Sequence, residues 1–299
     1  MNRPAQLSLA CLLACVSLPS HAEDNRGYSY FMGLSKQTLS YQETASILPI
    51  KTHAAISSPL LVTGGLFPMT ANVLLSLDAA STFAGQGTTE TWSATSSTLQ
   101  GAPLSNATLQ TNQFKLQQTR TNLLVHYRLG GQWFGIAGPA FHSQTFKRYS
   151  FQAGPDNATN IIAGQVIDES SSEIQLQLGI AFESENLRYT ASHTALRLYV
   201  AKPLWRSVEN TLVPNATFAG TSGFDAVVEG RYSLAVRDKL HIGFWAQYLR
   251  SVRGSDKQCI ADASRNGNVG VCGVNRSQAE LPKSTLTSQA YGLELLWKI

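Results

Sequence analysis

The segment Tyr291-Gly-Leu-Glu-Leu-Leu-Trp-Lys-Ile299 ends the sequence with a large apolar residue at every second position. Side chains of a β-strand point alternately to its two faces, so one face carries Tyr291, Leu293, Leu295, Trp297 and Ile299. The opposite face is small or polar, with Gly292, Glu294 and Lys298. A strand with one apolar face and an aromatic residue near its end is typical of a transmembrane β-barrel, where one face meets lipid and the other meets the lumen.

This ending resembles the C-terminal signal strand of bacterial outer-membrane β-barrels, with Lys298 and Ile299 extending past the usual final aromatic residue. The resemblance implies an integral protein of the Gram-negative outer membrane. It also implies a partner, the barrel-assembly machinery, which would bind the segment Tyr291–Trp297.

The N-terminus is typical of an export signal. Arg3 gives a basic start, Leu7–Leu18 an apolar run, and Ser20-His21-Ala22 a small-x-small cleavage site. The apolar run is too short to span a bilayer. An alternative is the lipoprotein-like box Leu12-Leu13-Ala14-Cys15, which would leave a very short signal. The sequence therefore predicts an exported protein with a cleaved leader.

We expect the leader to be Met1–Ala22 and residues 23–299 to form one outer-membrane domain. The whole chain carries 23 basic and 19 acidic residues, a near balance that gives no nucleic-acid signature. Cys259 and Cys272 are the cysteines that follow Ala22, and they bracket a loop rich in Asn, Gly and Ser. We predict a disulfide bond between them, because an exported chain enters an oxidising compartment.

Alternation and turn residues predict ten antiparallel strands. Their ranges are 28–41, 56–67, 72–83, 115–129, 132–146, 171–183, 187–205, 223–234, 239–252 and the terminal strand. Short turns alternate with long segments near 44–55, 84–113, 148–168, 206–222 and 253–283. This asymmetry predicts a transmembrane antiparallel up-and-down β-barrel with long extracellular loops and short periplasmic turns. A soluble β-sandwich is the alternative, since its strands also alternate.

The inward positions of these strands carry charges of both signs. We expect a polar network across the lumen from Asp78, Arg120, His126, Arg128, Glu173, His193, Arg197, Asp225, Glu229, Arg231 and Glu294. Buried charges need partners, and a small barrel is filled by its own side chains, so the lumen should be largely plugged. A narrow pore lined by Arg and Glu is the second interpretation.

Five basic residues fall at the predicted outer ends of strands: Lys147, Arg148, Arg206, Arg250 and Arg253. In an outer leaflet of lipopolysaccharide they would face its phosphates and form charge-assisted hydrogen bonds. Ordinary snorkelling of long side chains at the membrane surface predicts the same positions.

Strand number and chain length resemble the omptin proteases, which use acidic pairs and a histidine on the outer rim. The residues to weigh here are His142, His193 and Asp225, and no paired-carboxylate motif accompanies them on one rim. The sequence also has no Gly-rich phosphate loop and no metal-spaced His/Cys cluster. We therefore assign no catalytic residue, metal site or cofactor.

The function that we expect is a non-enzymatic surface platform whose extracellular loops recognise a ligand or mediate adhesion. The stapled segment Arg253–Lys283 and the uncharged, Ser/Thr-rich stretch near Ala84–Gln113 are the main candidates for contact. A porin-like passive pore for small solutes and an omptin-like surface hydrolase are the two alternatives.

Overall fold

The computed structural model describes residues 28–46, 50–95, 98–99, 102–103, 107–154, 166–184, 192–214, 216–261 and 272–299. The expected signal peptide, Met1–Ala22, lies outside the described residues. Every regular element in the described part is a β-strand: β1 Ser29–Thr44, β2 Ile50–Pro68, β3 Val73–Thr82, β4 Gly87–Ala94, β5 Thr98–Leu99, β6 Ala102–Pro103, β7 Thr108–Gly130, β8 Trp133–Ala153, β9 Ile167–Glu183, β10 Ser192–Asn210, β11 Thr217–Phe218, β12 Gly223–Arg237, β13 Leu240–Arg253, β14 Asp256–Ala261, β15 Arg276–Leu281 and β16 Lys283–Lys298. Within these ranges, no helix is long and apolar enough to cross a membrane.

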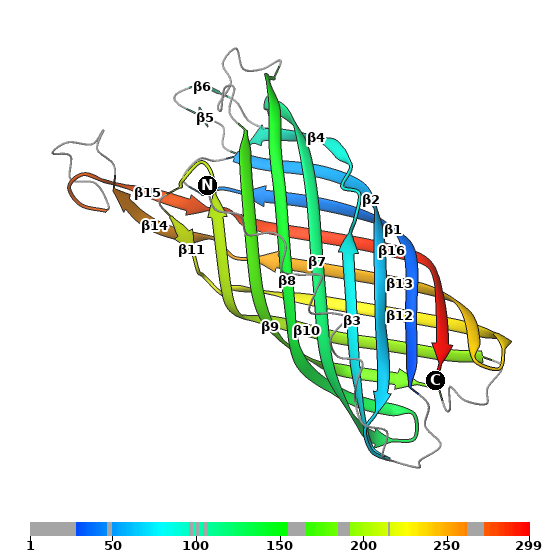
Figure 1. The fold of residues 1–299 in the computed structure, drawn as a ribbon. Helices are drawn as coiled ribbons and strands as arrows, with labels where there is room; N and C mark the ends of the chain where they lie inside the picture. The colour runs from blue at the N-terminus through cyan, green and yellow to red at the C-terminus, as the bar shows by residue number, and fades with distance from the viewer. Residues whose placement is uncertain are drawn as a thin grey trace, which may run out of the picture.

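Ten of these strands close into a ring, which confirms the predicted barrel (Figure 1). The order around the ring is β1, β16, β13, β12, β10, β9, β8, β7, β3 and β2, and β2 pairs back to β1. Each pairing in the ring is antiparallel. The pairing of β1 with β16 joins the first strand of the chain to the last. Closure leaves no free edge in the ring, as a barrel requires.

Short connections gather at one end of the barrel. β2 and β3 are joined there across Pro68–Val73, and β7 and β8 across Gly130–Trp133, where Gly131 adopts a positive φ of 54°. Ser29 pairs with Lys298, so β1 begins and β16 ends at this same end. We call it the short-turn end, and the opposite end the long-loop end.

Most strands extend beyond their predicted limits toward the long-loop end. β7 starts at Thr108, not near 115, and β8 continues to Ala153, not 146. The expected long segment 84–113 is wrong in part, because β4 and the start of β7 occupy much of it. The alternation of these stretches is polar outward and apolar inward, the reverse of the pattern used to define the lower strands.

The third position of the ring is one strand in two pieces. β3 and β4 both lie between β2 and β7 and run antiparallel to them, with residues 83–86 between the two pieces. Within the described chain, the pairing of β2 on this side stops at Ala54 and resumes at Leu60. We call this gap in the pairing the seam.

A band of exposed apolar side chains surrounds the half of the barrel nearer the short-turn end. On β9 the outward residues of this band run from Ile174 to Phe182, the ~9–11 residues of a membrane-spanning strand. Aromatic residues mark its borders, with Tyr127 and Trp133 at the lower edge and Trp205 at the upper edge. We call this band the apolar belt: Met32, Leu34, Leu61, Leu123, Val125, Phe141, Ile174, Leu176, Leu178, Ile180, Leu196, Leu198, Val200, Leu204, Phe224, Val228, Ile242, Phe244, Leu293 and Leu295.

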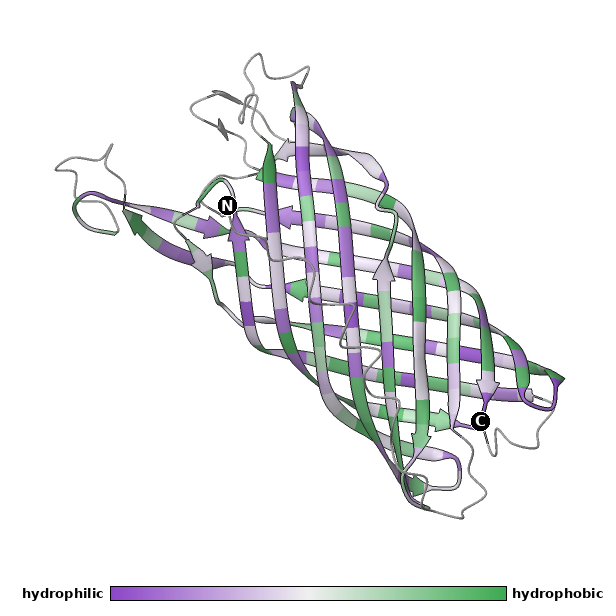
Figure 2. Cartoon of the chain, in the orientation of Figure 1, coloured by the Kyte–Doolittle hydropathy of each residue, from purple (hydrophilic) through white to green (hydrophobic). Residues whose placement is uncertain are grey.

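Beyond the belt the two faces exchange character. The part of the barrel between the belt and the long-loop end, which we call the collar, buries Leu39, Tyr41, Phe114, Leu116 and Phe146 inside. Its outward side chains are mostly Ser, Thr, Gln and Lys, and Figure 2 shows hydrophilic residues increasing toward this end. The collar is therefore packed like a water-soluble β-barrel, on top of a belt packed for lipid.

A hairpin of β14 and β15 projects from the long-loop end (Figure 1). Cys259 and Cys272 form a disulfide bond in it, with their Cα atoms 5.4 Å apart, as predicted. Its base is attached to the β11–β12 connection, since Asp256 accepts a hydrogen bond from the Gly220 amide at 2.9 Å. Buried Val208, Phe218 and Leu281 pack together beneath it.

Candidate functional site

The lumen is filled at its short-turn half by a network of charged side chains. Arg197 donates to Asp78 at 2.6 Å and lies 3.5 Å from Glu183, which also pairs with His193 at 3.3 Å. Arg231 joins Glu229 at 3.0 Å and Glu294 at 3.1 Å, linking β12 to β16. These side chains are at most 8% exposed, so each guanidinium is compensated by buried carboxylates.

The other two residues predicted for this region contribute local contacts. His126 is fully buried and shares a hydrogen bond of 2.9 Å with the Ser76 hydroxyl. Arg128 is only half-buried, and its guanidinium donates to the Gly131 carbonyl and covers the Phe134 ring at 4.9 Å. Arg128 thus braces the β7–β8 turn rather than joining the network.

A second cluster lies at mid-height. Arg120 bonds Asp225 at 3.2 Å and Gln175 at 3.2 Å, and Gln175 donates to Glu173 at 3.0 Å. Arg206 closes the cluster through a 2.7 Å bond from its Nε to Glu173. Side chains from β7, β9, β10 and β12 therefore meet across the barrel here.

A third cluster closes the lumen inside the collar. Arg148 donates to Glu43 at 2.7 Å and to Glu90 at 2.7 Å, and its guanidinium carbon lies 4.8 Å from the Phe146 ring centroid. Arg253 donates to Glu169 at 2.9 Å and lies 3.5 Å from Glu43. Two cations thus join carboxylates from three strands, β1, β4 and β9, amid the aromatic side chains of the collar.

The carboxylates of this collar cluster titrate differently. Burial raises the pKa of Glu90, but the Arg148 guanidinium and bonds from Arg148, Asn112 and Trp92 lower it more, so the net pKa is lowered. Burial raises the pKa of Glu43 by more than Arg148 lowers it. Glu90 is therefore the carboxylate of this pair that is harder to protonate, and Glu43 is the one that is protonated more easily.

Three of the five basic residues expected to face lipopolysaccharide point into the barrel instead. Arg148, Arg206 and Arg253 are 3%, 3% and 7% exposed, and each pairs with a glutamate. Arg148 and Arg253 lie inside because their strands continue past the predicted ends with unbroken alternation. Arg206 lies inside because a β-bulge between Pro203 and Trp205 shifts the facing of β10 by one residue.

The remaining two basic residues face outward. Arg250 is exposed on β13. Lys147 is exposed next to the buried Arg148 and lies 3.9 Å from Asp168. Adjacent residues of one strand face opposite sides of the sheet, and Lys147 is the outward member of this pair.

The residues weighed for catalysis are dispersed and buried. His142 lies in the middle of β8 and pairs in register with Glu173, because β8 is longer than expected. His193 is the second residue of β10, near the short-turn end, rather than mid-height. Both histidines are 6% exposed, so within the described chain neither reaches the rim of the long-loop end.

Sequence reasoning missed Glu43, Glu90, Glu169 and Glu183 as lumen residues. Glu43 follows Leu39 and Tyr41 at every second position, so it faces inward with them. Extending the predicted first strand beyond residue 41 would have placed Glu43 in the lumen. Glu90 stood in a stretch interpreted as a loop, although Glu90, Trp92 and Ala94 alternate with Thr and Ser.

A small cavity lies inside the barrel, between the network near the short-turn end and the cluster at mid-height. This cavity, of about 30 Å³, lies among Gln37, Asp78, Gln118 and Trp245, each of which has a buried polar atom without a hydrogen-bond partner. This space can hold a water molecule or two, which would satisfy these atoms.

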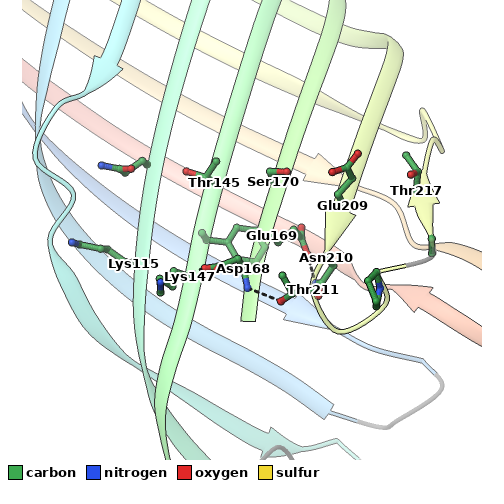
Figure 3. A pocket seen from close by; sticks show the side chains of 14 residues that line it. Lys115, Thr145, Lys147, Asp168, Glu169, Ser170, Glu209, Asn210, Thr211 and Thr217 are labelled. Carbon is green, nitrogen blue, oxygen red and sulfur yellow. Dashed lines mark hydrogen bonds and ion pairs between the residues drawn. The ribbon is translucent and has the colours of Figure 1, made fainter. Parts of the chain in front are cut away.

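A larger cavity lies outside, on the flank of the collar, with a volume of about 630 Å³ (Figure 3). We call it the flank groove. Its floor is the outer face of β7, β8, β9 and β10, and the β10–β11 turn forms one wall. The residues that line it are Lys115, Gln117, Thr145, Phe146, Lys147, Asp168, Glu169, Ser170, Glu209, Asn210, Thr211, Pro214, Ala216 and Thr217.

Hydrogen bonds fix the turn that forms the wall of the groove. The Asp168 amide donates to the Thr211 hydroxyl at 2.9 Å, and the Thr211 amide donates to the Asp168 carbonyl at 3.0 Å. Asn210 donates to Glu169 at 2.9 Å. Within the described residues, no group of His, Cys, Asp and Glu side chains is arranged to hold a metal ion.

Comparison with solved structures identifies outer-membrane β-barrels. The outer membrane protease OmpT from Escherichia coli matches with a TM-score of 0.63 at 8% identity, over 91% of this chain and 97% of that chain. The translocator domain of the autotransporter NalP from Neisseria meningitidis gives 0.30 at 11% identity, covering 91% and 89%. The Pseudomonas putida toluene transporter TodX gives 0.25 at 8%, covering 91% and 90%.

No family model and no curated protein sequence matches the chain. The OmpT match therefore shows the fold, an outer-membrane β-barrel, and supports an outer-membrane location. By this likeness of fold, the apolar belt corresponds to the lipid-facing band of an outer-membrane β-barrel.

Proposed function

We propose that this chain is a non-conducting outer-membrane protein whose extracellular collar and loops recognise a partner at the cell surface. The observation that carries the proposal is the closed interior of the collar, where Arg148 and Arg253 join three glutamates among packed aromatic rings. An ion or solute passing through would have to break this buried network. The cavity of about 630 Å³ is on the flank of the collar and not in the lumen.

The extracellular end supports recognition by its shape. The stapled β14–β15 hairpin projects from the barrel, and its base is fixed by contacts with β11 and the β11–β12 connection. A pre-ordered hairpin loses less conformational entropy on binding than a free loop. These features suit adhesion or ligand capture better than transport.

Several partners belong to the same proposal. The outward row of β16 from Tyr291 to Trp297 supports recognition by the barrel-assembly machinery during insertion. Export would use the leader Met1–Ala22, and exposed Arg250 would remain available to lipopolysaccharide phosphates.

No observation favours a hydrolase as a second function. His142 and His193 are buried in the lumen. His142 is opposite Glu173, which pairs with Arg206, and His193 pairs with Glu183, which also pairs with Arg197.

Planar-bilayer recording of the refolded protein tests the closed interior. We expect no steady conductance from the full chain, nor from a variant in which a short Gly-Ser turn replaces residues 256–281. Steady conductance from the full chain would refute the proposal. Conductance only after the replacement would make the hairpin the plug and would contradict the role given to the collar network.

Cell adherence tests the recognition role. Bacteria displaying the full chain should adhere to surfaces coated with collagen, fibronectin or mucin, and hairpin-replaced cells should adhere less. Adherence equal to that of cells lacking the protein, on all three coatings, would contradict a surface platform.

A further inference from the structure

The register of four strands arranges the outer face of the collar in rows. At the border of the apolar belt, Thr121, Phe141, Ile174 and Trp205 are directly opposite one another on β7, β8, β9 and β10. The next row up is wholly hydroxyl-bearing: Thr119, Ser143, Ser172 and Ser207. The two rows above it form the floor of the flank groove: Gln117, Thr145, Ser170 and Glu209, then Lys115, Lys147 and Asp168.

The distance of the groove from the apolar belt follows from the spacing between successive rows. Successive rows are two residues apart, ~6.6 Å along a strand or about 5 Å along the normal for a strand tilted by ~40°. The two groove rows therefore stand about 10 and 15 Å above the belt. A phospholipid headgroup layer is only about 5–7 Å deep on each side of the hydrocarbon. The groove opens sideways at the height where the sugars of an outer-leaflet glycolipid lie.

The groove is electrically balanced. Its exposed charges are Lys115 and Lys147 against Asp168 and Glu209, and Lys147 already lies 3.9 Å from Asp168. A phosphate would gain no net attraction from this set. The carboxylates, amides and hydroxyls that remain are the groups that hydrogen-bond sugar hydroxyls.

An extended peptide fits the groove poorly. Peptides that add to a sheet bind the backbone of a free edge, whereas β8 and β9 here are paired on both sides throughout the groove. Only side chains are offered, and Thr211 and Asn210 hold the wall of the groove in place before any ligand arrives. A rigid polar groove of this kind suits a stiff, hydroxyl-rich ligand.

We propose that the flank groove binds neutral sugar residues of the glycolipid headgroups in the outer leaflet, with Asp168 and Glu209 as the main acceptors of sugar hydroxyls. This site is independent of the proposed surface recognition, because a conducting or a closed barrel could equally carry it. It would anchor the collar laterally in the saccharide layer of the membrane.

Calorimetric titration of the purified full chain in detergent tests the site. The probe is the lipid-free core oligosaccharide of lipopolysaccharide, used intact and after enzymatic removal of its phosphates. The double variant Asp168→Ala/Glu209→Ala is compared with Ser40→Ala/Thr44→Ala, which removes outward hydroxyls of β1 on the same collar. Gel mobility before and after heating verifies that each variant is folded.

We expect the dephosphorylated probe to bind the wild type and the β1 control equally, and the groove variant about tenfold more weakly or less. The groove variant distinguishes sugar binding from phosphate binding. Removing Asp168 and Glu209 leaves Lys115 and Lys147, so the groove becomes positive and would bind a phosphate more tightly. A groove variant that binds the intact probe more tightly would show phosphate recognition and overturn the proposal. Absence of binding by the wild type, or equal loss in the control, would also overturn it.

Discussion

Replacement of Arg148 by methionine should destabilise the barrel far more than the same change at its neighbour Lys147. Arg148 is 3% exposed and holds Glu43 and Glu90 at 2.7 Å each, whereas Lys147 lies 3.9 Å from Asp168 on the solvated face. Methionine preserves most of the apolar stem, so the comparison isolates the charge.

The magnitude follows from burial. At an effective dielectric constant of ~20, each carboxylate about 4 Å from the guanidinium centre gains ~4 kcal/mol, which desolvation of the ions largely offsets. Removing Arg148 leaves Glu43 and Glu90 buried without that compensation, so we expect a loss of about 3–5 kcal/mol. The exposed Lys147 pair should contribute at most about 0.5 kcal/mol.

Urea unfolding of the protein in detergent, followed by tryptophan fluorescence where unfolding and refolding curves coincide, measures both values. The triple variant Arg148→Met/Glu43→Gln/Glu90→Gln should recover much of the loss, because no unpaired charge then remains. An Arg148→Met cost within about 1 kcal/mol of the Lys147→Met cost would refute the buried collar network.

Three further outcomes follow. Replacing Cys259 and Cys272 by serine should speed proteolysis of the β14–β15 hairpin while leaving the unfolding midpoint of the barrel unchanged, as limited proteolysis and urea titration would show; a lower midpoint would contradict this. Because the pKa of Glu90 is lowered on folding, its stabilisation is present above about pH 4.5 and lost as the pH falls further, so the stability gap between wild type and Glu90→Gln should narrow in acid; a gap that widens would reverse the assignment. Gly131→Val should cost about 1–2 kcal/mol because φ is 54° there, and Gly130→Val, in equally open space without a positive φ, should cost less in the same titration; equal costs would count against the turn geometry.

The barrel itself was predictable because large apolar residues alternate with small or polar ones along the strands of its belt. Large apolar residues at every second position predicted ten strands and their order, and the ring confirms both. The facing of the second strand was wrong, because Leu60 and Val62 are buried inside while Leu61 faces outward. The collar was less predictable because its strands have polar residues outward and apolar residues inward, the reverse of the belt. Once the outward side chains become Thr and Gln, outward apolar residues no longer mark the strand, so β7 and β8 were predicted shorter than they are.

The errors at basic residues have the same origin. Lys147 and Arg148 are adjacent, so period two alone requires them to face opposite ways, and only the inward Phe146 says which is which. Arg206 could not be placed from parity, because the β-bulge after Pro203 changes the facing without a distinct sequence signal. The partners Glu43 and Glu90 come from distant strands that only the closed ring brings together.

The seam divides the molecule in a way that hydrogen exchange can detect. Between Ala54 and Leu60 β2 has pairing only toward β1 in the described chain. A second gap lies on β10, which has pairing only toward β9 between Ala201 and Val208. The collar beside the seam can therefore open as a local unit, at a free energy below that of global unfolding. Amides flanking the seam should exchange first, and a ligand that orders the collar should slow them while leaving the membrane-spanning belt unchanged.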